Sequence, residues 1–234
     1  MFALGDAVEL GTGDARKVAV VLRARDGDAI EVVDSSGRVY AGRVRLDGKH
    51  VRAVLEREAG APRALRLAVT LAQGLPKGPK MDFVVEKATE LGVAAILPFA
   101  SSRTAGDGAR AGKLERWRRI AKSAAQQCGR VEVPEVAEPI DFAGLVERAA
   151  SYDLVLVPWE LAGAGPLRER LPELIEGVRS VLLAIGPEGG FSHEEARALE
   201  LAGAVLVSLG SRILRTETAG LVAYAVLLYA SGDI

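Results

Sequence analysis

The stretch between Val181 and Tyr229 constrains the fold of this 234-residue chain more than any other part. It begins with the apolar run 181–185, which has the length of a buried strand and ends in the glycine-rich turn 186–190. A second apolar run, 204–208, ends in another loop and leads into a long apolar helix. Because α/β proteins bind ligands at the carboxyl ends of parallel strands, this pattern predicts an α/β domain with a ligand site at that edge.

Two common phosphate-binding motifs are absent from this stretch. A Rossmann fingerprint needs Gly-x-Gly-x-x-Gly after a strand, and Gly186-Pro187-Glu188-Gly189-Gly190 does not fit it. A P-loop ends in Gly-Lys-Ser/Thr, and that triplet occurs nowhere in the chain. Glu188 adds negative charge beside the first loop, while Arg212 and Arg215 add positive charge beside the second. The sequence therefore argues against triphosphate chemistry and favours a zwitterionic cofactor with an aromatic part.

Four motifs in a fixed order identify a resemblance. Residues 185–192 read Ile-Gly-Pro-Glu-Gly-Gly-Phe-Ser, and residues 209–219 read Leu-Gly-Ser-Arg-Ile-Leu-Arg-Thr-Glu-Thr-Ala. Upstream, residues 77–92 read Lys-Gly-x-Lys-Met-Asp-x-x-Val-x-Lys-x-x-Glu-Leu-Gly, and residues 127–130 read Gln-Cys-Gly-Arg. Together they resemble the bacterial ribosomal RNA small-subunit methyltransferase E family, and the match runs from about residue 65 to 233.

This resemblance implies both a fold and an activity. The fold is α/β, with a SPOUT-type, trefoil-knotted parallel-sheet domain over residues 65–234 and a small PUA-like, RNA-binding β-barrel over residues 1–62. The activity is transfer of a methyl group from S-adenosylmethionine to N3 of one uridine in 16S ribosomal RNA, and the expected partner is this RNA within the small ribosomal subunit. SPOUT enzymes are typically homodimers, so the resemblance implies a homodimer as well.

Two other functions remain compatible with the residues. A SPOUT methyltransferase could act on transfer RNA or on another ribosomal position, because the catalytic motifs do not name the target. A noncatalytic RNA-binding protein of ribosome assembly could keep the knot as a scaffold, although the intact cofactor loops count against this reading. Binding of S-adenosylmethionine separates the scaffold from both enzymes, and a panel of RNA substrates separates the two enzymes.

The resemblance places the cofactor contacts at the strand ends of the second half of the chain. Glycines let a backbone approach a ligand closely, although an ordinary strand-to-helix turn would use them too. Apolar residues of the second loop would form a slot for the adenine, or else belong to the core. The implied cofactor-binding residues are Pro158, Ile185, Gly186, Gly189, Gly190, Leu209, Gly210, Ile213, Leu214, Arg215 and Thr216.

Methylation at N3 of uridine requires the loss of a weakly acidic imide proton. Either a base accepts the proton or a cation stabilises the enolate that forms. Arg215 is the candidate for holding O2 or O4, and Glu217, or a water that it orients, is the candidate proton acceptor. The structural alternative is that Thr216 caps the last helix and that Glu217 interacts with the dipole of its first turn.

Basic residues are concentrated in the middle of a chain whose net charge is −1. Residues 77–130 contain eleven Lys and Arg against five Asp and Glu, whereas residues 131–234 contain seven against sixteen. RNA affinity depends on neutralising phosphates, so these residues could form a phosphate-facing surface, and the alternative is a solvated helix face. The candidate RNA-binding residues are Arg16, Lys17, Arg23, Arg25, Lys77, Lys80, Arg103 and Arg130, with further basic residues at Arg110, Lys113, Arg116, Arg118, Arg119 and Lys122.

Composition excludes several classes of protein. No uncharged apolar run has the length of a membrane span, and Met1 is not followed by a basic and then apolar signal region, so we expect a cytoplasmic protein. Cys128 is the single cysteine, so no internal disulfide can form. His50 and His193 are isolated, and we expect no metal site.

Periodicity predicts the individual elements. Residues 6–58 alternate apolar and polar in short stretches and predict about five strands, with hairpin turns at Asp26-Gly27, Ser36-Gly37 and Asp47-Gly48. Ser192 and Glu195 have the spacing of a capping box. The last helix is apolar on almost every side, which predicts burial all round, in the core or at a subunit interface. Later strands are predicted at 65–71, 94–99, 154–158, 181–185 and 204–208, and helices at 81–91, 114–128, 166–177, 193–201 and 217–230.

Overall fold

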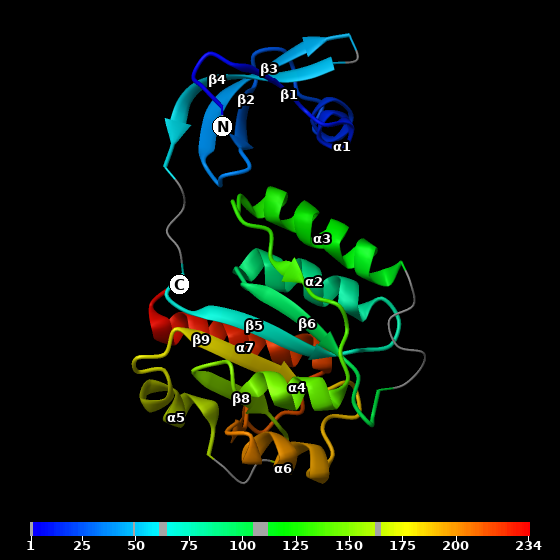
Figure 1. Ribbon diagram of the computed structural model, residues 1–234, viewed down its shortest axis with the longest axis vertical. Coiled ribbons are helices and arrows are strands. Elements are labelled where there is room, and N and C mark those ends of the chain that lie inside the picture. The colour runs from blue at the N-terminus through cyan, green and yellow to red at the C-terminus, as the bar shows by residue number, and fades with distance from the viewer. Residues whose placement is uncertain (1, 49, 61–64, 105–111, 162–164) are drawn as a thin grey trace. The chain divides into compact units, whose positions relative to one another are not determined.

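The computed structural model describes residues 2–48, 50–60, 65–104, 112–161 and 165–234. The chain divides into two compact units, Met1–Arg63 and Ala64–Ile234, and each unit has its own sheet (Figure 1). The glycine-rich segment 105–111, which includes the candidate RNA contact Arg110, lies outside the described residues.

The smaller unit is built on an antiparallel sheet with the strand order β1-β4-β3-β2. Its described residues form four strands instead of the expected five or so, because residues 12–21 are helical and their apolar residues run together without the alternation of a strand. All three predicted hairpin turns contain a glycine with positive φ. The elements of this unit are β1 (Ala7–Glu9), α1 (Thr12–Arg16), the π-helix η1 (Lys17–Val21), β2 (Ala29–Val33), β3 (Val39–Asp47) and β4 (His50–Ala59).

One face of the small sheet carries its core. Tyr40, Ala53 and Leu55 are buried there, and Phe2 packs edge-on against the Tyr40 ring at a centroid distance of 5.9 Å. The Tyr40 hydroxyl donates to the Phe2 carbonyl at 3.3 Å. Only alternate residues of β2 contribute to this core, as expected for a sheet that is covered on one face.

The larger unit is an α/β fold around a six-stranded parallel sheet with the order β10-β8-β9-β5-β6-β7 (Figure 1). The predicted parallel sheet is therefore confirmed, and its central strands β8, β9 and β5 are almost wholly buried and apolar. Its elements are β5 (Ala68–Gly74), α2 (Lys80–Leu91), β6 (Ala95–Phe99), α3 (Lys113–Cys128), β7 (Glu135–Val136), α4 (Phe142–Ala149), β8 (Leu154–Pro158), α5 (Leu167–Leu174), β9 (Ser180–Ile185), α6 (His193–Leu201), β10 (Val205–Val207) and α7 (Thr216–Ser231).

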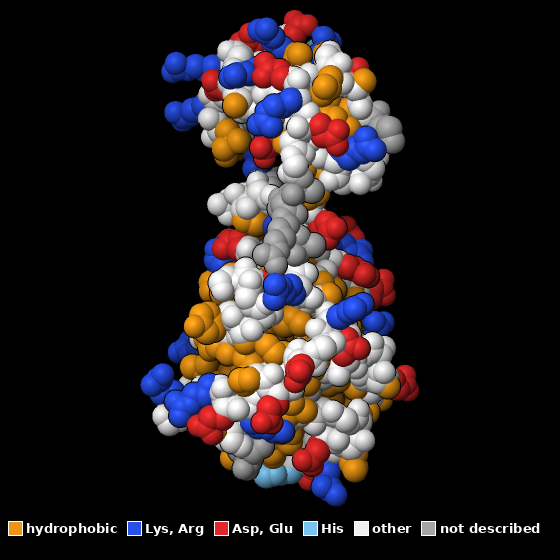
Figure 2. All heavy atoms as spheres, turned by 90° about the vertical axis from the view of Figure 1, so that its left-hand side faces the viewer, with side chains coloured by type: hydrophobic (Ala, Val, Ile, Leu, Met, Phe, Trp, Pro, Cys, Tyr) orange, Lys and Arg blue, Asp and Glu red, His pale blue; other side chains and the backbone are white. Residues whose placement is uncertain are grey.

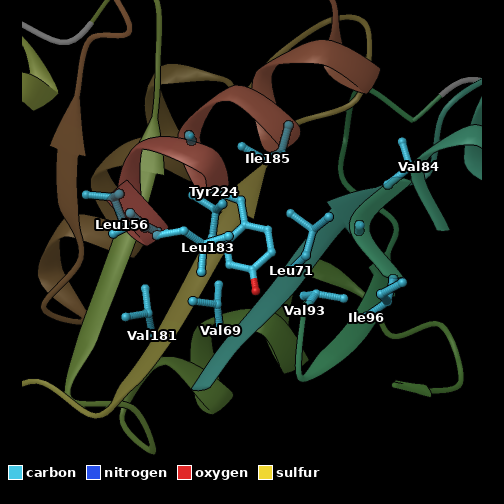
Figure 3. Close-up of a cluster of buried hydrophobic side chains, with 14 of the residues drawn as sticks. Val69, Leu71, Val84, Val93, Ile96, Leu156, Val181, Leu183, Ile185 and Tyr224 are labelled. Carbon is cyan, nitrogen blue, oxygen red and sulfur yellow. The ribbon is translucent and has the colours of Figure 1, made fainter. Parts of the chain in front are cut away.

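Alternation along the strands divides the core of the larger unit into two layers. On β9, Val181, Leu183 and Ile185 face the layer that contains α2, α5 and α7, whereas Leu182 and Ala184 face the layer that contains α4 and α6. Each strand thus supplies both layers, since successive side chains point to opposite faces of the sheet. In Figure 3 the Tyr224 ring of α7 lies in the first layer among residues of the sheet, and its hydroxyl points away from Ile185.

Helix ends follow the local sequence closely. Ser192 and Glu195 form the predicted capping box at the start of α6. Gly92 and Gly129 end α2 and α3 in the left-handed conformation, as their positions predict. The sequence analysis did not predict β7 and α4. Asp141 is a residue type that favours the start of a helix, and its carboxylate caps α4 by accepting from the Gly144 N–H at 2.8 Å.

The predicted first strand of this unit is shifted along the chain. Residues 65–71 were the expected strand, and the structure begins β5 at Ala68 and continues it to Gly74. The extent of β5 is set by the strands that it pairs with, because Ala68 pairs with Ser180 of β9 and Gly74 pairs with Phe99 of β6. These partners lie far away in the sequence, so a local pattern does not reveal them.

Helix α7 is buried against the sheet on one face, and its other face is exposed in the single chain, so the expected burial all round would need a subunit interface. Tyr224 and Leu227 face the core, whereas Val222 is 38% exposed and Tyr229 is 77% exposed. The sheet covers one side of the helix, and Val222 and Val226 on the other side border a groove of about 540 Å³ with residues 208–212 and the start of α5. Figure 2 looks at the side that carries α5 in Figure 1, and a band of hydrophobic side chains runs across the larger unit there.

No helix in the described part of the chain combines the length and the apolar character that crossing a membrane demands.

Candidate cofactor-binding site

A cavity of about 320 Å³ lies where β8, β9 and the loop before α7 end. Its volume is within the range of small-molecule sites, and its position at the carboxyl edge of the sheet is the one that the sequence predicts. The lining combines apolar side chains, the backbone of the glycine turn and a few charged groups, and its residues are Lys80, Pro158, Trp159, Glu160, Ile185, Gly186, Pro187, Glu188, Gly190, Phe191, Ile213, Leu214, Arg215, Thr216 and Ala219.

The glycine turn after β9 is packed so closely that side chains are excluded from it. A Cβ on Gly186 would lie 2.8 Å from the carbonyl carbon of Gly190. Gly190 has φ of 65°, and a Cβ there would lie 3.0 Å from the Glu160 Oε1. The turn therefore needs glycine at Gly190 both for the positive φ and for the close approach to the Glu160 carboxylate, which follows β8.

The start of α7 is tied to this turn by a buried side chain. The Thr216 hydroxyl donates to the Gly186 carbonyl at 2.6 Å. Gln73, near the end of β5, donates from Nε2 to Thr216 Oγ1 at 2.7 Å. The ends of β5 and β9 and the start of α7, which are distant in the sequence, are therefore connected at the cavity.

Lys80 lines the cavity and connects two acidic residues, Glu188 in the lining and Glu217 at the start of α7. Its ammonium lies 3.0 Å from Glu188 Oε1 and 3.5 Å from Glu217 Oε2. The hydrogen bond to Glu188 holds the pKa of Lys80 above its usual value. Partial burial opposes ionisation of Glu188, but the hydrogen bonds from Lys80 and from the Lys77 backbone outweigh it and lower the pKa of Glu188. This pair therefore stays charged over the whole neutral range.

Arg215 and Glu217 differ sharply in their surroundings. The Arg215 side chain is 81% exposed, and its Nη1 lies 4.0 Å from Glu217 Oε1. The Glu217 side chain is only 15% exposed, and its Oε2 is buried without a hydrogen bond to any described residue, although Lys80 lies within ion-pair distance. The Arg215 side chain is thus free to move toward a large ligand, whereas the Glu217 carboxylate is a fixed acceptor.

Comparison with known proteins adds an independent result. A family model described as "RNA methyltransferase domain" matches residues 63–228. Ribosomal RNA small subunit methyltransferase E of Bacillus subtilis is 33% identical over 223 residues, which cover 92% of this chain and 87% of the relative. The enzyme of the same name from Mycobacterium bovis is 37% identical over 88% of this chain and 79% of the relative.

The chain belongs to the ribosomal RNA small subunit methyltransferase E family.

Two solved structures support this membership. Ribosomal RNA small subunit methyltransferase E of Neisseria gonorrhoeae, bound to S-adenosyl methionine, is 31% identical and superposes with a TM-score of 0.86 over 98% of this chain and 94% of the other. A methyltransferase of Legionella pneumophila in complex with the cofactor SAM is 32% identical, with a TM-score of 0.87 and the same coverage. These comparisons confirm the resemblance to the methyltransferase E family that the four motifs indicated.

Most residues that the sequence implies for the cofactor line one cavity. Pro158, Ile185, Gly186, Gly190, Ile213, Leu214, Arg215 and Thr216 all do so. Gly189 does not, and its carbonyl accepts from Arg103 Nη1 at 2.7 Å. Leu209 and Gly210 instead border the groove beside α7. Thr216 is the first residue of α7 and not its cap, because Arg215 occupies the cap position and the Thr216 hydroxyl is used on Gly186.

The candidate RNA-binding residues fall into separate groups. Lys77, Lys80 and Arg103 surround the glycine turn of the cavity. Arg130 has a structural contact, because its Nη1 donates to the carbonyls of Thr89 and Val93 at 2.9 and 3.0 Å and so satisfies the end of α2. In the smaller unit, Arg16 and Lys17 lie in the α1–η1 segment, and Arg23 and Arg25 follow it, with Arg23 at a φ of 52°.

Sequence reasoning missed several residues of the site. Trp159, Glu160 and Phe191 line the cavity; the first two directly follow a predicted strand, and Phe191 lies in the motif 185–192, so each had a sequence signal. Gln73 and Gly74 gave none, because they approach the site from the end of β5, more than 100 positions before Gly186 in the chain. Their contribution depends on the pairing of β5 with β9.

Proposed function

We propose that this protein transfers a methyl group from S-adenosylmethionine to N3 of a uridine in 16S ribosomal RNA of the small ribosomal subunit. Family membership supports ribosomal RNA methylation, and two relatives of similar length hold the cofactor. The observation that carries the proposal for this chain is the cavity at the carboxyl edge of its parallel sheet. Three of the four motifs that carry the resemblance contribute residues to its lining, and the motif 127–130 does not.

The residues of the cavity fit that cofactor. Ile185, Ile213 and Leu214 provide apolar surface for an adenine ring. Gly186 and Gly190 line the cavity without side chains, so the turn presents backbone groups for the ribose and the amino acid part. The carboxylates of Glu160 and Glu188 provide negative charge at the same cavity for a cationic ligand. When bound, S-adenosylmethionine supplies an activated methyl group on a sulfonium.

Proton removal from uridine N3 is assigned to residues at the start of α7. Glu217 is the proposed proton acceptor, directly or through a water, and its buried Oε2 without a hydrogen bond leaves a lone pair for this purpose. Arg215 is the proposed partner of uracil O2 or O4, where negative charge develops as the proton leaves. Its 81% exposed side chain can reach a base that enters from solvent.

The remaining expectations concern assembly and the substrate. The smaller unit is proposed to be a PUA-like RNA-binding barrel in which Arg16, Lys17, Arg23 and Arg25 contact phosphates. Lys77, Lys80 and Arg103 are proposed to hold RNA beside the cavity. The end of the larger unit is proposed to be a trefoil knot, and the exposed apolar face of α7 supports the homodimer that the resemblance implies. Sedimentation of the full chain tests the dimer directly.

Methyl transfer to small ribosomal subunits is the decisive experiment. Subunits isolated from cells that lack this gene are incubated with labelled S-adenosylmethionine, and the modified nucleoside is identified by mass spectrometry. N3-methyluridine at a single site supports the proposal. Cofactor binding without transfer would point to another RNA, and the absence of cofactor binding would point to a scaffold. Naked 16S RNA, run in parallel, shows whether the assembled subunit is needed.

A further inference from the structure

Gln73 is a fully buried polar residue that neither the motifs nor the family comparison assigns to the site. Its exposed fraction is 0%, and it does not line the cavity. It pairs with Ile185 across β5 and β9, so it lies directly beside a residue that does. A buried amide costs free energy that an apolar side chain of the same size would not, so its presence calls for a reason.

The hydrogen bonds of Gln73 run in one direction only. Nε2 donates to Thr216 Oγ1 at 2.7 Å and to the Gly74 carbonyl at 3.1 Å, which uses both amide hydrogens. The single hydroxyl hydrogen of Thr216 goes to the Gly186 carbonyl, so Thr216 must accept from Gln73. A flipped amide would place its oxygen against two acceptors, so the contacts fix the orientation.

The other end of the amide shows what this arrangement costs. Gln73 Oε1 is buried and has no hydrogen-bond partner among the described residues. It faces Gly220 of α7, where an added Cβ would lie 3.6 Å from Oε1, 3.2 Å from Leu71 Cδ1 and 3.3 Å from Ile185 Cγ1. The helix therefore packs closely over β5 and β9, and the unsatisfied oxygen is tolerated for the sake of the donor end.

We infer that Gln73 is a positioning residue for the cofactor cavity. It presets the Thr216 hydroxyl as a donor to Gly186, and so it fixes the start of α7 against the glycine turn of β9. Both segments contribute to the cavity lining, so their relative position determines how well the cavity fits its ligand. This inference rests on the proposed binding of S-adenosylmethionine, and it adds a third strand, β5, to the machinery of the site.

The test compares the affinity of full-length variants for S-adenosylmethionine by calorimetry. Gln73→Met keeps the volume of the side chain and removes its donor, and we expect the affinity to fall about tenfold, since a hydrogen bond to a preorganised group is worth roughly that factor. Thr89→Val is the matched control, because Thr89 is equally buried and its hydroxyl donates within α2, to Val85 at 2.7 Å. We expect its affinity to equal that of the wild type.

A double-mutant cycle distinguishes positioning from general loosening of the core. If Gln73 acts through the Thr216 hydroxyl, then Gln73→Met, Thr216→Val and the double variant should lose similar factors of affinity, because each breaks the same connection. Multiplication of the two single losses in the double variant would show that Gln73 acts independently of Thr216 and would overturn the inference.

Gln73→Glu supplies a pH readout and replaces the methionine variant if that variant does not fold. An ionised carboxylate can only accept, so it competes with Gly186 for the Thr216 hydrogen, whereas a protonated carboxyl donates again. Burial raises the pKa of such a carboxyl, so we expect cofactor affinity relative to wild type to recover as the pH falls from 8 to about 5.5. A constant ratio would overturn the inference. Failure of the wild type to bind would instead defeat the proposed function.

Discussion

The substitution Gly74→Ala tests how closely the strand ends around the cavity are packed. Gly74 is the buried last residue of β5 and does not line the cavity. A Cβ there would lie 2.5 Å from Pro187 N, 2.7 Å from Pro187 Cδ and 2.8 Å from the Gly186 carbonyl carbon. None of these atoms can rotate away, because two belong to the backbone and one to a proline ring.

The magnitude follows from the required movement. Ordinary contact begins at 3.4 Å, so β5 and the glycine turn must separate by about 0.9 Å. Overpacking of this kind typically costs about 1–3 kcal/mol, and the rigid neighbours here favour the upper half of that range. A loss of about 2–3 kcal/mol lowers the melting temperature of a chain of this size by roughly 4–12 °C. Cofactor affinity should fall too, because the turn moves with Gly186.

Gly165→Ala is the matched control in the same unit. Gly165 does not have a positive φ, and among the described residues an added Cβ would meet only Glu169 Oε2, at 3.8 Å. Thermal unfolding and calorimetric binding of S-adenosylmethionine are measured for both variants. We expect Gly165→Ala to stay within about 0.5 kcal/mol of the wild type. The reasoning is refuted if Gly74→Ala melts with the control and binds the cofactor equally well.

Three further predictions concern charged and polar groups. Arg215→Ala should lower methyl transfer at least about 100-fold, as expected for a group that stabilises charge in the transition state. The equally exposed Arg168→Ala serves as its control, and normal transfer by Arg215→Ala would remove the proposed role. Lys80→Met should destabilise the protein most between about pH 5 and pH 10. The raised pKa of Lys80 contributes stability until the pH rises through it, and the lowered pKa of Glu188 contributes stability until the pH falls through it. Urea unfolding of the variant and the wild type is measured across this range, and a difference in free energy of unfolding that stays constant with pH would contradict the pairing. Tyr224→Phe should leave the melting temperature unchanged or raise it, because the buried hydroxyl has no hydrogen-bond partner among the described residues and burial raises its pKa. A clear fall in the melting temperature would contradict this prediction.

Sequence reasoning worked best where the determining interactions are local. The capping box at Ser192 and Glu195 lies within four residues, and the glycines that end α2 and α3 act through their own backbone angles. Short apolar runs predicted β8 and β9 because strands that are buried on both faces show a continuous apolar pattern. It failed at residues 12–21, which are helical, and at the two-residue strand β7, where the local pattern is too short to decide.

The sequence by itself determined the family, the parallel sheet and the glycine turn, since each is written in contiguous motifs. Only the tertiary structure decided which residues meet at the cavity. The pairing of β5 with β9 brings Gln73 and Gly74 to the site, and the return of α7 places Thr216 on Gly186. The tertiary structure also places the residues of the loop before α7 at two different sites. Ile213 and Leu214 line the cavity, whereas Leu209 and Gly210 border the groove beside α7. The physical reason is that side-chain contacts between distant segments depend on strand order and register, which no local spacing encodes.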